Sequence, residues 1–171
     1  MTEPTFCSAT ACHARKEAIE TFASKFAKDV GYAAGGSLED IVQRLGGKII
    51  YQSPNELGET AEASIRVFGK GRFEIYLPDF TTAERDRFSI AHEIGHYLLH
   101  YPLQNKPMVA ARFGSNRVEW EANWFAAGFL MPADAFRAAH DEAQGRLTLV
   151  AAQFNVSVAA AEARAKALGL I

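Results

Sequence analysis

The chain has 171 residues, a length typical of one domain, and 49% of them are hydrophobic, so a substantial core is available. Its formal net charge is -2, and acidic and basic residues are mixed along the sequence rather than gathered in arms or tails. This composition predicts neither a nucleic-acid partner nor a membrane partner.

The N-terminal stretch, residues 1–13, is rich in small residues, and we expect it to be flexible. It lacks the basic and apolar parts of a secretory signal, and no apolar run approaches the roughly 20 residues that span a bilayer. We therefore expect a cytoplasmic protein. Cys7 and Cys12 are the only cysteines. They could hold a metal with His13, but three ligands without a second cluster favour free thiols that have no function.

Two helices are predicted next. Apolar residues recur at helical spacing over 14–30, and the helix ends at Gly31. Ser37 then caps a short helix that the glycine pair 46–47 ends.

The strands of the predicted sheet follow these helices. Segment 48–53 reads as a strand, and segments 62–68 and 72–78 alternate apolar and polar residues on either side of the turn 69–71. This alternation predicts a hairpin with one buried face. The resulting sheet is small and has at least one free edge, along which we expect extended substrates to pair.

Two long helices are predicted in the second half of the chain. Thr81 and Glu84 form a capping-box pattern at the start of the first, over about 82–100. The second runs over about 116–130 and ends before Pro132, which pushes the preceding residue out of the helical conformation.

The segment between these helices, about 101–115, is expected to be a connection. The C-terminal part, 145–171, is expected to form two short helices around "NVS", a hairpin that resembles a helix-turn-helix. Because we find no repeat or low-complexity linker, residues 14–171 are interpreted as a single α+β domain.

The first long helix contains the motif "HEIGH", formed by His92, Glu93 and His96. Residues four apart lie one turn above each other, so both imidazoles can face one ion while Glu93 reaches a metal-bound water. The alternative is a pair of surface histidines with a solvated glutamate. The apolar residues around the motif argue against it, because buried polar groups need partners. Two histidines, a carboxylate and a water make an open tetrahedral zinc site, so a third ligand is required.

The extended form of this motif would place glycine at 99 and histidine at 102, and Leu99 and Pro102 exclude it. His100 lies one turn beyond His96 and could be a ligand or a transition-state donor. The favoured interpretation is a histidine that caps carbonyl groups at the helix end.

The missing carboxylate is expected from the second long helix, which offers Glu119 and Glu121. Glu119 is favoured, because it shares a face with small or polar residues, among them Asn123, which could orient a ligating histidine. Glu121 shares its face with aromatic residues and is the alternative ligand. Glu119 also fits a capping box with Asn116, in which its carboxylate would bond to the N-cap amide instead.

Together, "HEIGHYLLH" and the later "EWEANWFAAGFLMP" resemble the ImmA/IrrE family of metallopeptidases. The resemblance covers most of the chain and leaves out the first dozen residues. It implies a zincin-like fold with a small, mostly antiparallel sheet beside the active-site helix. Zinc would be held by His92, His96 and a glutamate of the second helix, with Glu93 as the general base. In related thermolysin-like peptidases the third ligand lies in E-x-x-x-D, which Glu119 to Asn123 matches with Asn in place of Asp.

The resemblance further implies an endopeptidase that hydrolyses a peptide bond with a metal-activated water. Family members commonly cut a helix-turn-helix repressor encoded beside them, which controls mobile elements, prophages or stress genes. Some relatives carry their own N-terminal DNA-binding domain, and the residues before Ala14 leave no room for one. We therefore expect the repressor to be a separate protein cut in trans.

Two other functions are compatible with the sequence. One is a toxin-like zinc hydrolase of a two-gene toxin–antitoxin module, and the other is a non-catalytic regulator with a structural zinc. Direct DNA binding is not expected. The last predicted helix has only two cations, Arg164 and Lys166, and an anion, Glu162, lies close to them, so few positive charges are available for phosphates.

The oxyanion of the transition state needs a further hydrogen-bond donor. Spacing alone does not choose among four candidates near the motif: Arg85, Tyr97, His100 and Tyr101.

Overall fold

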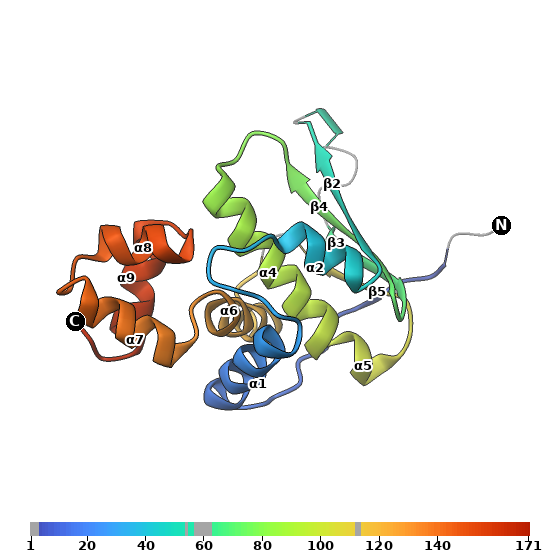
Figure 1. Ribbon diagram of the computed structural model, residues 1–171. Helices are drawn as coiled ribbons and strands as arrows, with labels where there is room; N and C mark the ends of the chain where they lie inside the picture. The colour runs from blue at the N-terminus through green and yellow to red at the C-terminus, as the bar shows by residue number, and fades with distance from the viewer. Residues whose placement is uncertain (1–3, 54, 57–62, 112–113) are drawn as a thin grey trace.

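A mixed β-sheet with long helices packed on one of its faces forms the body of the protein (Figure 1). The computed structural model describes residues 4–53, 55–56, 63–111 and 114–171. Within them, the predicted α+β class is confirmed. No helix in this part of the chain combines the length and the apolar character needed to cross a membrane.

The sheet has the strand order β1-β5-β3-β4-β2. The predicted hairpin is present as the antiparallel pair β3–β4, and β5 pairs antiparallel with the other side of β3. The outer strands pair in parallel, β2 with β4 and β1 with β5, so the sheet is mixed. The strands are Cys7–Ser8 (β1), Gly47–Gln52 (β2), Ala63–Gly69 (β3), Arg72–Pro78 (β4) and Met108–Ala111 (β5).

The segment interpreted as a connection, 101–115, contains structure that the sequence pattern does not reveal. Its described residues include a short helix α5, Tyr101–Gln104, and the strand β5. A strand of four residues is too short to show a clear alternation of apolar and polar residues. Its pairing with β3 supplies the order that the local sequence lacks.

The described part of the N-terminal stretch, residues 4–13, is held against the body, whereas the sequence predicts flexibility. Cys7 donates its amide to the carbonyl of Pro107 at 2.9 Å, and Ala9 donates to that of Val109 at 3.0 Å. These bonds join segments about a hundred residues apart, so composition around residue 10 does not encode them.

Side chains cap the N-termini of α2 and α4. Ser37 accepts a bond from the amide of Asp40, as predicted. The helix of the HEIGH motif starts one residue later than predicted, because Thr82 is its N-cap and the hydroxyl of Thr81 instead bonds to Asp86. The helices of the body are α1 (Lys16–Asp29), α2 (Leu38–Arg44), α4 (Ala83–Leu99) and α6 (Arg117–Leu130).

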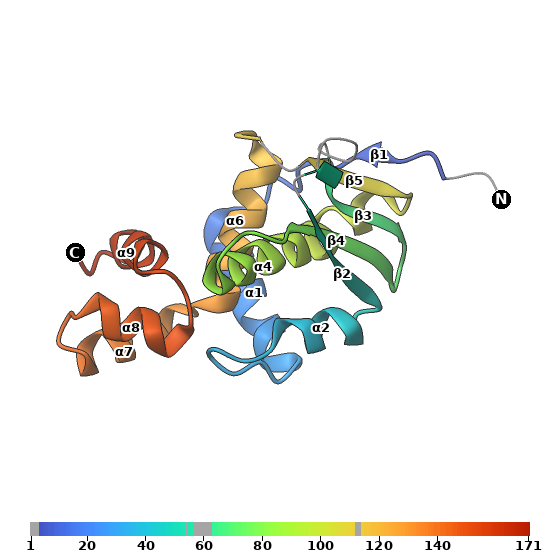
Figure 2. The same cartoon turned by 90° about the horizontal axis from the view of Figure 1, so that it is seen from above.

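Helix α4 lies between the sheet and α6 (Figures 1 and 2), and α1 packs on the side of α6 away from α4 (Figure 1). Two glycines allow these helices to approach closely. A Cβ added at Gly95 of α4 would lie 3.1 Å from the side chain of Phe125 in α6. One added at Gly128 of α6 would lie 2.8 Å from the Cα of Glu20 in α1. This close packing brings the first turn of α6 next to the histidines of α4.

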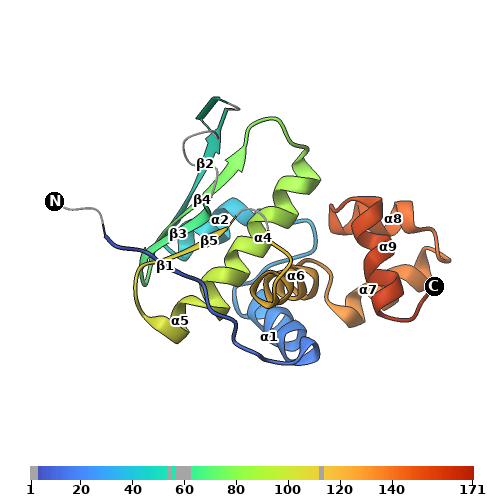
Figure 3. The same cartoon turned by 180° about the vertical axis from the view of Figure 1, so that it is seen from behind.

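Three further helices form the C-terminal part, at the end of the molecule away from the sheet (Figures 1 and 3). Two buried arginines hold it to the body. Arg87 of α4 donates to the carbonyls of Asn155 and Gly36, and Arg164 of α9 donates to the carbonyl of Met131. The helices are α7 (Ala133–Glu142), α8 (Leu147–Phe154) and α9 (Val158–Ala167), of which α8 and α9 match the predicted pair around "NVS".

Candidate metal centre

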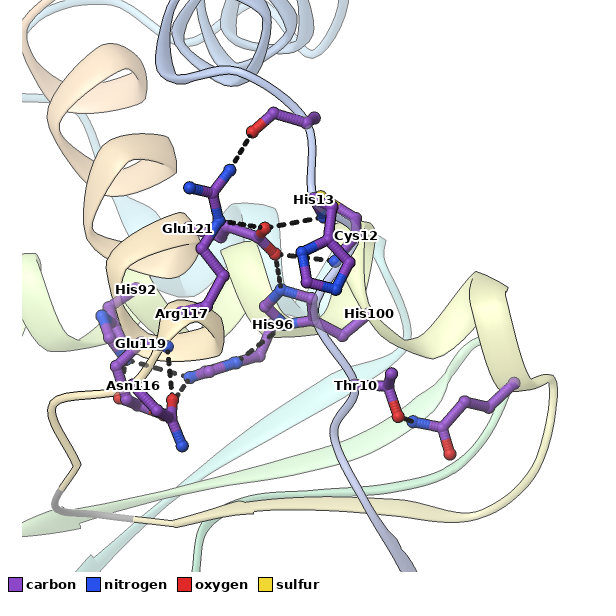
Figure 4. Close-up of polar contacts among 12 residues, drawn as sticks. Thr10, Cys12, His13, His92, His96, His100, Asn116, Arg117, Glu119 and Glu121 are labelled. Atoms are coloured by element: carbon purple, nitrogen blue, oxygen red, sulfur yellow. Dashed lines mark hydrogen bonds and ion pairs between the residues drawn. The ribbon is translucent and has the colours of Figure 1, made fainter.

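The two histidines of the HEIGH motif face each other on the inner side of α4 (Figure 4). Their Nε2 atoms are 3.0 Å apart, as the four-residue spacing predicts. His96 is fully buried and His92 is partly exposed. The pair therefore presents two imidazole nitrogens at one point.

Glu119 reaches the same point from the first turn of α6. Its carboxylate oxygens lie 3.1 Å from Nε2 of His92 and 3.3 Å from Nε2 of His96. The N-cap residue Asn116 accepts a bond from the amide of Glu119 at 3.2 Å. Capping thus uses the backbone of Glu119, whereas its carboxylate faces the histidines, so the two roles coexist.

The residues fit a zinc ion. One ligand atom each from His92, His96 and Glu119 lies within 4.8 Å of the others, and within the described residues this is the one such group of three. Two imidazole nitrogens and a carboxylate are a donor set that zinc accepts with an open fourth position. The other ring nitrogen of each histidine already has a partner: Nδ1 of His92 lies 2.8 Å from Asn123, and Nδ1 of His96 lies 3.0 Å from His100. Each Nε2 therefore faces the point at which a metal could bind.

The protonation states of His96 and Glu119 suit a cation, whereas His92 must lose a proton to bind one. Burial lowers the pKa of His96 to about 4, so this ring is neutral at pH 7. Burial alone would raise the pKa of the Glu119 carboxyl, but its bonds to the two histidines lower it to about 2. Burial also opposes the charge on His92, yet the neighbouring Glu119 and Glu93 carboxylates raise the pKa of His92 above its usual 6.5.

Zinc affinity is expected to fall as the pH drops from about 8 to about 6, by up to about tenfold per pH unit for each proton displaced. Zinc needs the neutral ring of His92, and the raised pKa means that this ring gains its proton at a higher pH than a free imidazole does. Competition with a chelator at several pH values measures the effect. An affinity that stays constant over this range would contradict it.

A cleft of about 720 Å³ opens beside these groups. It is bordered by His92 and Glu93 of α4 and by Glu119 and Asn123 of α6. Glu93 is only 4% exposed, so its carboxylate lies at the wall of the cleft rather than in bulk water. The described strand residues that line the cleft belong to β3 and β4, which are inner strands of the sheet, whereas the sequence predicts that substrates pair along a free edge.

Glu121, the alternative ligand, lies away from the metal-facing atoms. Its fully buried carboxylate bonds to His100, to Arg117 and to the backbone amides of Cys12 and His13 (Figure 4). Burial alone would raise the pKa of this carboxyl, but Arg117 and the amide of Cys12 lower it to about 2. No local pattern predicts this role, because the two amides are more than a hundred residues away.

The four candidate transition-state donors occupy different places. The hydroxyl of Tyr97 accepts a bond from the amide of Gly71 at 2.8 Å, so it points toward the β3–β4 turn. His100 is buried behind His96, and Tyr101 is buried in the core. Arg85 lines the cleft. Of the four, Arg85 alone borders the described cleft.

Both cysteines are partly buried against the body of the protein. The thiol of Cys7 donates to Oε1 of Gln104 at 2.7 Å, and burial raises the pKa of the Cys12 thiol. In the described parts of the chain, neither joins a group of potential metal ligands with His13.

Comparison with known proteins identifies related sequences and folds. The family profile described as "IrrE N-terminal-like domain", Peptidase M78, matches residues 44–166, which include both histidines and Glu119. A solved structure of a Mycobacterium tuberculosis transcriptional regulator has a similar fold, with a TM-score of 0.60 and 18% sequence identity. The similarity covers 85% of this chain but 45% of that one, so the chain spans less than half of its length. The search of curated proteins found no match.

Proposed function

The chain belongs to the Peptidase M78 family of IrrE N-terminal-like domains, and from this membership we propose that it is a zinc-dependent endopeptidase. The observation that carries the proposal is the convergence of His92, His96 and Glu119 beside a cleft that Glu93 also borders. A purely structural zinc site would be closed by four protein ligands, whereas this group leaves a position for water or substrate.

The positions of the side chains support the following roles. His92, His96 and Glu119 would hold the zinc, which when bound polarises a peptide carbonyl and makes water more acidic. Glu93 then acts as the general base, takes a proton from the attacking water and passes it to the leaving amine. Asn123 keeps the ring of His92 oriented. Arg85, at the rim of the cleft, is placed to donate to a substrate carbonyl.

The substrate we propose is a separate protein, a helix-turn-helix transcriptional repressor that is cut in trans within an exposed loop. The family membership supports a peptide substrate, and a cleft of about 720 Å³ has room for a short stretch of polypeptide. The solved protein of similar fold is itself a transcriptional regulator, which agrees with a role in gene control.

Helix α9 offers little support for direct binding of DNA. Arg164 of α9 is 3% exposed and bonds to Met131 and Glu20, so it is turned into the protein. Lys166 is exposed but pairs with Glu162 at 2.6 Å. These cations of α9 are thus already engaged, and phosphate contacts need free ones.

The test is to incubate the zinc-loaded protein with the product of the adjacent gene. We expect one discrete cleavage, which a chelator abolishes and added zinc restores. If the neighbour is a helix-turn-helix protein that stays intact while a random peptide mixture is cut, the repressor is not the substrate. Failure to bind zinc, or to cut either substrate, would overturn the proposed peptidase.

A further inference from the structure

A buried pair, His100 and Glu121, lies directly behind the metal-facing His96 (Figure 4). Nδ1 of His96 and Nδ1 of His100 are 3.0 Å apart, and Nε2 of His100 is 3.0 Å from Oε2 of Glu121. All three side chains are completely excluded from solvent. Because water cannot serve as an alternative partner, the protein itself decides which nitrogen carries each proton.

His96, His100 and Glu121 form a row of hydrogen-bonded side chains, and the end away from the metal-facing atoms is the Glu121 carboxylate, which is surrounded by donors. Oε2 of Glu121 accepts from the amide of Cys12 at 2.8 Å and faces His100, while Oε1 accepts from the amide of His13 at 2.8 Å and from Arg117 at 2.9 Å. His13 has a left-handed backbone with φ of 57°, and its amide and that of Cys12 meet on one carboxylate. A carboxylate has about four acceptor sites, and these four groups use them.

This arrangement determines the direction of the hydrogen bonds. A neutral imidazole donates from one nitrogen and accepts at the other. Since Glu121 accepts, Nε2 of His100 carries a proton and Nδ1 of His100 accepts. Nδ1 of His96 must then donate, which leaves the lone pair of His96 on Nε2. That atom is the one that faces His92 and Glu119.

We propose that His100 and Glu121 are positioning residues that hold His96 as its Nδ1-protonated tautomer and aim its Nε2 at the metal. The inference rests on the proposed function, because it assigns these residues a purpose only if His96 is a ligand. It also gives the N-terminal segment a role, since the amides of Cys12 and His13 hold Glu121 in place. Partners of this kind hold the rings of metal-binding histidines in many proteins.

The first test is long-range proton–nitrogen NMR of the histidine rings in the metal-free protein, which distinguishes the two tautomers. We expect His96 protonated at Nδ1 and His100 protonated at Nε2. A proton on Nε2 of His96, or a doubly protonated His100, would overturn the proposal. This measurement does not depend on activity. It therefore tests the positioning of His96 by His100 and Glu121 even if the proposed peptidase function fails.

The second test compares His100→Leu with His100→Asn by chelator competition for zinc and by the absorption spectrum of the cobalt-substituted protein. His100→Leu removes the acceptor for His96, so zinc affinity is expected to fall about 10- to 100-fold and the cobalt spectrum to change. His100→Asn places an amide oxygen near the former Nδ1 and is expected to recover most of the loss.

The matched control is His140→Leu, which changes a mostly buried histidine of α7, and it is expected to leave zinc affinity unchanged. Zinc affinity of wild-type strength in a folded His100→Leu variant would overturn the proposal. If His100→Leu does not fold, the His100→Asn variant and the NMR measurement on the unaltered chain decide the question.

Discussion

Replacing Glu93 by glutamine is expected to lower the rate of peptide cleavage about 10²- to 10⁴-fold, the usual contribution of a general base, while zinc remains bound. Glutamine keeps the size of the side chain but cannot take a proton from water. Glu93 borders the cleft beside His92, and it is not one of the three residues whose ligand atoms converge. The loss should therefore appear in the cleavage rate and not in the zinc content.

Elemental analysis and a cleavage assay on the same preparation separate these two quantities. His92→Ala is the useful comparison, because it should lose zinc and cleavage together. A Glu93→Gln variant that cleaves at the wild-type rate would remove Glu93 from the mechanism. Loss of zinc in this variant would make Glu93 a ligand instead.

Zinc affinity is expected to fall more than about 100-fold in Glu119→Gln, beyond the 10- to 100-fold range typical of residues behind the ligands. The carboxylate supplies both a ligand atom and a negative charge, and its oxygens lie 3.1 and 3.3 Å from the two imidazoles. The substitution leaves the amide of residue 119 free to bond to Asn116, so the start of α6 should persist.

Chelator competition measures this affinity, and circular dichroism confirms that the helix content is unchanged. Glu142→Gln, at an exposed position of α7, is the control for loss of one negative charge and should bind zinc like the unaltered chain. If Glu121→Gln reduces the affinity more than Glu119→Gln does, the two carboxylates have exchanged roles and Glu121 is the ligand.

Local patterns were enough to predict most elements of this fold. The periodicity of apolar residues predicts the helices α1 and α4, Pro132 marks the end of α6, and the alternation around residues 69–71 predicts the hairpin β3–β4. These features depend on neighbours three or four positions away, or on directly alternating residues, so a single sequence contains them.

The metal-facing residues were also predictable, for a similar reason. The spacing of His92 and His96 forces both rings onto one side of a helix, and the structure places them so. Glu119 could be favoured over Glu121 because it shares a face with small or polar residues such as Asn123. In the structure, Gly95 of α4 contacts Phe125 of α6, which lies one turn from Glu121, so helix packing alone does not separate the two carboxylates. Their contacts do, because Glu119 faces His92 and His96 whereas Glu121 bonds to His100.

Only the tertiary structure decided which partners hold these residues in place. Sequence alone placed His100 at a helix end and Cys12 in a flexible stretch, and it offered no partner for Glu121. In the fold, α4, α6 and the N-terminal segment meet, and their polar groups form one buried row that ends at His96. By itself the sequence identified candidate metal ligands, with Glu119 favoured over Glu121, because helical spacing is a local property. The structure decided which residues hold them there, because contacts across a hundred residues leave no periodic pattern.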